Sequence, residues 1–248
     1  MKRLSFSIAL GIVGLFFLPT SCDHQAIDEL EVQPYLFLER GGGLSLQDQQ
    51  MLRKAFVRAG IRFQDGKFRF KAQSGNELNM SEQLFEMLKG IVDNSNNRRL
   101  SMSFKGNPPR LKSGAEIPTS PADTTASDCV AHSISAVLAG FGKSVSSTDI
   151  DTWIQSEYGT NGVPGNAFYD VLDNYVVGES CEVPSSFSYS NTGPFIVLAI
   201  DLNGGGHSVT LMEVSGHSIM YRDDQNDGGT GICHIDDVRY AYQASSAL

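Results

Sequence analysis

The chain has 248 residues, 41% of them hydrophobic, and a formal net charge of −9. This length and hydrophobic content are sufficient for one domain of ordinary size and a second, smaller one. The acidic charge argues against nucleic acid as a partner, because phosphate binding needs a basic surface.

The first 22 residues have the pattern of a secretory signal, with two basic residues, an apolar run over 8–18 and small residues before Cys22. Residues 18–22 (Leu-Pro-Thr-Ser-Cys) resemble a bacterial lipobox, in which the Cys carries the lipid, although Pro19 stands where Leu is usual. The apolar run is shorter than the ~20 residues of a membrane-spanning helix. We therefore expect a protein of a Gram-negative cell envelope, anchored to the membrane by lipid on Cys22. The alternatives are an ordinary cleaved signal and an uncleaved anchor.

An acidic spacer, residues 23–34, and a small α/β unit, residues 35–106, are expected next. This unit is either a propeptide or a permanent accessory domain. Hydrophobic periodicity and turn signals predict its elements: a helix over 45–59, a hairpin of 61–63 and 68–70 around Asp65-Gly66, a helix capped by Asn79, and a strand over 100–104.

A linker rich in Pro, Ser and Thr, residues 107–127, leads to the second unit, residues 128–248. Helices come first in this unit and strands later, which is typical of an α+β fold. The predicted elements are helices over 129–139, 146–158 and 166–176, a strand over 195–202, and a hairpin of 209–214 and 218–222.

Three residues of the second unit form a candidate catalytic set. Cys129 opens a helix, where the helix dipole and backbone N–H groups are expected to lower a thiol pKa. His207 follows three glycines and is the candidate base that activates the thiol. Asp223 ends the strand antiparallel to the one that His207 begins, so the hairpin is expected to bring it to the imidazole as the orienting residue. Asp224 is the alternative orienting residue.

Four segments together resemble the papain-like cysteine peptidases of the C39 type: 128–129, 142–146, 207–211 and 221–223. The resemblance covers about residues 127–242 and implies a papain-like fold, in which the Cys-bearing helix packs on an antiparallel sheet. It also implies that Cys129, His207 and Asp223 cleave a peptide or protein substrate through a thioester acyl-enzyme. We expect neither a cofactor nor a metal.

One departure from that family concerns the oxyanion. Such peptidases usually place a Gln a few residues before the Cys, whereas the nearest upstream glutamine here is Gln83. Loss of an oxyanion donor costs about 10² to 10³ in rate. The candidate replacements are Ser127, Thr124 and Thr125, and an inactive binding or inhibitory module of the same fold is the competing hypothesis.

The Asp128-Cys129 pair at a helix start also resembles the NlpC/P60 cell-wall hydrolases. That family usually carries a second histidine on the strand that follows the strand of the catalytic histidine. Here His217 falls in the predicted turn, before that strand begins. A cell-wall amide hydrolase is therefore the second enzymatic hypothesis.

The remaining cysteines, Cys181 and Cys233, can form a disulfide in an oxidising envelope or stay as buried thiols. The acidic loop over 223–228 offers oxygen ligands for Ca²⁺ but lacks the glutamate that completes the usual calcium loop. We therefore expect no metal in this loop.

Overall fold

The structure, a computed structural model, describes residues 46–103, 124–125, 127–160, 162–202, 205–225 and 228–248. It has the α+β class expected from the sequence, with helices packed on a largely antiparallel sheet. The signal segment with Cys22, the acidic spacer and most of the predicted linker lie outside the described residues. Within the described ranges, no helix combines the length and the apolar character needed to cross a bilayer.

The N-terminal part holds two helices and a hairpin: α2 (Leu46–Ala59), β1 (Arg62–Gln64), β2 (Lys67–Arg69), the short 3-10 helix η2 (Asn76–Leu78) and α3 (Glu82–Ser103). The hairpin is as predicted. Asp65 and Gly66 both have positive φ, 51° and 76°, as the two central residues of a type I′ turn require.

Two predictions in this part were wrong. Asn79 does not cap α3: it ends η2 in the left-handed conformation, and Ser81 Oγ instead accepts the Leu84 N–H at 3.3 Å. Residues 100–103 are not a strand but the last turn of α3. Extending a formed helix adds one hydrogen bond for each residue fixed, and this favours continuation over a new element.

The helices of the second part are α4 (Ser127–Gly140), α5 (Ser147–Tyr158) and α6 (Phe168–Asp173). The N-cap of α5 is Ser146, whose side chain accepts the Thr148 N–H. α6 ends at Asp173, three residues short of the prediction, because Val176 begins a strand that pairs with the C-terminal strand. Short 3-10 turns, η4 (Gly165–Ala167) and η5 (Ile235–Asp237), complete the helical segments.

One sheet dominates the fold, with the order β4-β3-β7-β6-β10-β5, while β8 pairs with β7 and β9. The predicted strand over 195–202 and the hairpin that follows it are confirmed. The strands that the sequence analysis did not predict are β3, which lies in the predicted linker, and β4, β5, β9 and β10. The bounds are β3 (Thr124–Thr125), β4 (Val163–Pro164), β5 (Val176–Ser180), β6 (Phe195–Leu202), β7 (Gly205–Ser215), β8 (Ser218–Asp223), β9 (Gly229–His234) and β10 (Val238–Ala247).

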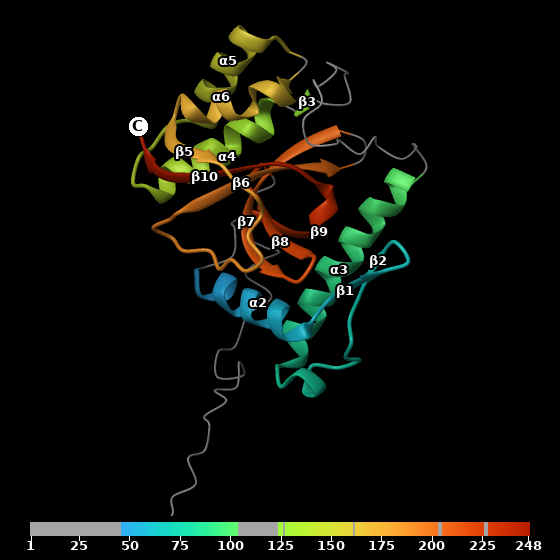
Figure 1. Cartoon of the computed structure of the whole chain (residues 1–248). Coiled ribbons are helices and arrows are strands. Elements are labelled where there is room, and N and C mark those ends of the chain that lie inside the picture. Colours follow the sequence, from blue (N-terminus) through green and yellow to red (C-terminus); the bar gives the residue numbers. More distant parts are fainter. Residues whose placement is uncertain (1–45, 104–123, 126, 161, 203–204, 226–227) are drawn as a thin grey trace, which may run out of the picture.

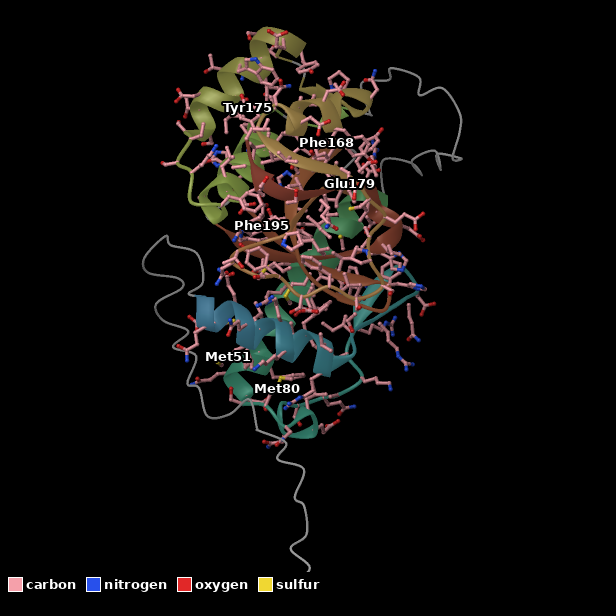
Figure 2. All side chains as sticks on the ribbon, turned by 60° about the vertical axis from the view of Figure 1, so that its left-hand side comes forward. Met51, Met80, Phe168, Tyr175, Glu179 and Phe195 are labelled. Atoms are coloured by element: carbon pink, nitrogen blue, oxygen red, sulfur yellow. The ribbon has the colours of Figure 1, made fainter. Side chains whose placement is uncertain are left out.

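Two helical groups pack on different parts of this sheet (Figure 1). Helices α4 to α6 bury one hydrophobic cluster against β6 and β10, here called the α4 cluster, and it includes Phe168 and Phe195. Helices α2 and α3 bury a second, the α2–α3 cluster, which includes Met51 and Met80. In Figure 2, Phe168 and Phe195 lie above Met51 and Met80, which are beside the N-terminal helices.

The α2–α3 cluster is continuous with the sheet of the second part. Met212, Met220 and Ile232, from β7, β8 and β9, belong to it. The Ile232 N–H donates to Ser95 Oγ of α3 at 3.0 Å, and Arg53 of α2 donates to the carbonyl oxygen of Tyr189. The two units expected from the sequence therefore share a core and buried hydrogen bonds.

Candidate active site

The pairing of β7 explains why distant residues meet at its start. The short strand β3 runs parallel to β7, with Thr125 opposite Gly206, and α4 begins two residues later. β8 pairs along β7 from Thr210 to the turn, so its last residue, Asp223, returns to the same end of β7. The start of α4, the start of β7 and the end of β8 therefore lie together.

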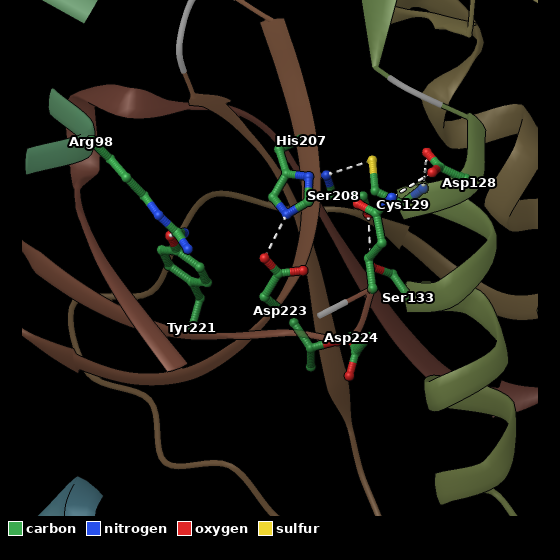
Figure 3. A network of polar contacts seen from close by, with 11 residues as sticks. Arg98, Asp128, Cys129, Ser133, His207, Ser208, Tyr221, Asp223 and Asp224 are labelled. Carbon is green, nitrogen blue, oxygen red and sulfur yellow. Dashed lines mark hydrogen bonds and ion pairs between the residues drawn. The ribbon is translucent and has the colours of Figure 1, made fainter. Parts of the chain in front are cut away.

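Cys129 lies in the first turn of α4 and is fully buried. Its Sγ accepts the backbone N–H of Ser208, the residue after His207, at 3.2 Å. The Ser208 hydroxyl in turn donates to Ser133 Oγ, one turn along α4, at 3.0 Å (Figure 3). These contacts fix the sulfur against the residue that adjoins the candidate base.

Burial raises the pKa of Cys129 to about 12, against 9.0 for an ordinary thiol. The Ser208 N–H favours the thiolate and lowers the pKa, but it does not outweigh the loss of water around the sulfur. The Asp128 charge acts in the same direction as burial and raises the pKa further. The expectation that the helix start lowers this pKa was therefore wrong. In this arrangement Cys129 is a neutral thiol.

His207 and Asp223 are in contact: Nε2 lies 3.1 Å from Asp223 Oδ2. The Asp223 side chain is 4% exposed and the His207 side chain 15%. A carboxylate only accepts hydrogen bonds, so the proton of a neutral His207 sits on Nε2 and Nδ1 keeps its lone pair. Figure 3 shows the imidazole between Asp223 and Cys129, with the second ring nitrogen toward the Cys129 side.

Asp224, the alternative orienting residue, is engaged elsewhere. It accepts from Thr210 Oγ1 at 2.6 Å and from Arg222 Nε at 2.5 Å. Burial, the largest single effect, disfavours the charged guanidinium, but Asp224 and Tyr189 together outweigh burial and raise the pKa of Arg222. Arg222 also donates to the Tyr189 hydroxyl at 3.2 Å. Asp224 thus ties β8 to β7 and leaves the contact with His207 to Asp223.

Sequence reasoning missed a polar contact at the start of α4. Asp128 Oδ1 accepts the backbone N–H of Cys129 at 2.8 Å, and Oδ2 accepts the side-chain amide of Gln225. Gln225 follows Asp223 by two residues, in the acidic loop over 223–228. Its amide chemistry was legible in the sequence, but its position depends on the β7–β8 pairing.

The three predicted oxyanion residues lie close together in the chain, in β3 and at the start of α4. Ser127 begins α4 and is buried, 8% exposed. Thr124 and Thr125 form β3, of which the structure describes the backbone. Thr125 pairs with Gly206 of β7, and Thr124 and Ser127 lie one and two residues from Thr125 along the chain.

No family model, curated protein or solved structure matches this chain. The case for a function therefore rests on the geometry of the described residues.

The other sequence-derived candidates lie apart from this site. Cys181, half-buried, and Cys233, buried, are both thiols, with no disulfide between them. The described part of the chain holds no group of three or more His, Cys, Asp or Glu side chains arranged to bind a metal ion. His217 lies in the β7–β8 turn, its ring 5.6 Å from that of His234.

Proposed function

We propose that this chain is a cysteine peptidase of the papain-like type, similar to the C39 peptidases, exported and tethered to the cell envelope through Cys22. The observation that carries the proposal is the chain of contacts from Asp223 to His207 and from Ser208 to the Cys129 sulfur. A nucleophile, a base and an orienting carboxylate in this order are what acyl transfer to a thiol needs.

The first half-reaction begins with a neutral thiol, so His207 acts as a general base. As Cys129 Sγ bonds to the substrate carbonyl carbon, its proton passes to His207 Nδ1 and the carbonyl oxygen takes the negative charge. The C–N bond then breaks, and the departing nitrogen takes the proton from His207. A thioester on Cys129 remains. Asp223 stabilises the imidazolium through Nε2.

The second half-reaction releases the acid product. Water gives a proton to His207 Nδ1 as its oxygen attacks the thioester carbon. The C–S bond breaks and the proton returns to the sulfur, which restores the neutral thiol. His207 is therefore the proton acceptor and then the proton donor in both half-reactions.

A second candidate function is a binding or inhibitory module that keeps this fold without turnover. The full burial of Cys129 favours it, because a substrate carbon must reach the sulfur. This hypothesis predicts that removal of the thiol changes no biochemical effect of the protein.

The test is cleavage of a diverse peptide mixture by the purified chain, read by mass spectrometry. Cleavage by the parent is expected, with complete loss in Cys129→Ala and His207→Ala. Cys233→Ala is the matched control, because it also removes a buried thiol but leaves the site intact, so it should retain cleavage. Products that persist in Cys129→Ala would contradict the proposal, and isolated peptidoglycan as a parallel substrate separates a peptidase from a cell-wall hydrolase.

A further inference from the structure

Two hydrogen-bond donors converge on one carboxylate beside the Cys129 sulfur. The Cys129 backbone N–H points at Asp128 Oδ1 from 2.8 Å, and the Gln225 side-chain amide donates to Asp128 Oδ2. One donor belongs to the start of α4 and the other to the turn after β8. The two elements meet only because β3 and β8 pair with the same strand, β7.

This pair of donors has the composition of an oxyanion hole. Attack of a thiol on a carbonyl moves negative charge onto the oxygen, and the stabilising donors must already point to that place. In the serine-peptidase triad the backbone N–H of the nucleophile is one of these donors, and a side-chain amide is a suitable second donor. The Asp128 carboxylate presents to these donors the same kind of atom, an anionic oxygen, that the reaction would create.

We propose that the Cys129 N–H and the Gln225 amide form the oxyanion hole of this enzyme, and that the Asp128 carboxylate fills it until a substrate carbonyl takes its place. The proposal rests on the peptidase function proposed above. It assigns to Gln225 the part of the glutamine that the sequence lacks before Cys129.

The surroundings allow this exchange. Asp128 is exposed, so its carboxylate can turn into water when a substrate enters. Its charge also contributes, after burial, to the raised pKa of the Cys129 thiol. One side chain thus occupies the donors and disfavours the thiolate; its movement into water frees the donors and weakens its charge effect on the thiol.

Helix capping is the competing explanation for Asp128. An acidic residue in the first turn stabilises a helix through its dipole and its N–H groups. Capping predicts that Asp128 and Gln225 affect the stability of α4 but not the relative rates of two reactions at the same sulfur. Comparing two such reactions therefore separates the hypotheses.

The experiment compares acylation and alkylation of Cys129 in the full chain at one pH, about 9, where some thiolate is present. 4-Nitrophenyl acetate acylates the thiol through a tetrahedral oxyanion: the S–C bond forms, the C–O bond breaks, 4-nitrophenolate leaves, and His207 accepts the thiol proton. Iodoacetamide displaces iodide at a saturated carbon and forms no oxyanion. Rates of a Cys129→Ala variant are subtracted for reaction at other groups.

The ratio of acylation to alkylation rates should fall about 100-fold in Gln225→Ala and Gln225→Glu. Gln155→Glu is the matched control, because Gln155 Nε2 likewise donates to a neighbouring aspartate, Asp151, at 2.7 Å, but on α5. This control should keep the parent ratio. Asp128→Ala should raise the ratio, since it empties the site.

Each outcome decides between the hypotheses. An unchanged ratio in both Gln225 variants overturns the oxyanion assignment while the proposed function stands. If the parent and His207→Ala react equally with both reagents, the proposed function fails instead, and the oxyanion assignment fails with it. A variant that does not fold is recognised by a faster alkylation of the normally buried Cys129, and the second Gln225 variant then decides.

Discussion

The two helical groups that pack on the sheet contribute differently to the candidate site. α4 carries Cys129 itself, and the α4 cluster buries that thiol. Among the described residues, α2 and α3 provide none of the proposed catalytic groups, but they pack on β8 and β9, the strands on either side of the turn with Gln225. Cys129 and Asp223, the carboxylate that orients His207, are thus supported by different helical groups. Both groups contact β7.

The largest effect is expected at Asp223, the carboxylate at the end of β8 that contacts His207. Asp223→Asn should lower the acylation rate of Cys129 by about 10⁴, because an asparagine amide can donate to His207 Nε2 and place the proton on Nδ1. The rate with 4-nitrophenyl acetate measures this. Asp173→Asn is the control, since Asp173 also accepts a hydrogen bond, from the Tyr242 hydroxyl, but belongs to none of the proposed catalytic contacts. A loss below tenfold in Asp223→Asn would contradict the orienting role.

Local patterns in the sequence predicted much of what positions these residues. The helix that carries Cys129, the apolar strand over 195–202 and the hairpin after His207 follow from periodicity and turn residues. Together with the order of Cys129, His207 and Asp223, these elements were sufficient to predict the His207–Asp223 contact.

Features set by tertiary packing were not predictable in this way. The pKa of Cys129 depends on the residues that exclude water from the sulfur, and several belong to distant strands. The contact of Gln225 with Asp128 joins residues 97 positions apart. The strand β10 did show alternation at Tyr240, Tyr242 and Ala244, a signal that sequence reasoning overlooked.

A second prediction concerns the thiol that the α4 cluster buries. With a pKa of about 12, the thiolate fraction of Cys129 should rise tenfold for each pH unit below that value. The alkylation rate with iodoacetamide should therefore increase about 10³-fold between about pH 7 and pH 10, without levelling near the ordinary thiol pKa of 9.0. A rate that is flat between about pH 6 and pH 8 would instead indicate a preformed thiolate–imidazolium pair.

The smallest expected effect is a loss of stability that tests whether the two helical groups fold as one. Phe56 in the α2–α3 cluster and Phe168 in the α4 cluster are both fully buried, so truncation of either to alanine should lower the free energy of unfolding by about 3–5 kcal/mol. The single tryptophan, Trp153, lies in α5, and its fluorescence in urea therefore reports on the α4 side alone.

The shared core predicts that Phe56→Ala shifts the Trp153 transition as much as Phe168→Ala does, because Met212, Met220 and Ile232 couple the two clusters. A removable propeptide that folds independently would leave the Trp153 transition of Phe56→Ala at its parent urea concentration. The equal shift would make α2 and α3 a permanent part of the domain. An unshifted transition would mean that the support of β8 and β9 by these helices is dispensable, and that Asp223 keeps its place through β7 alone.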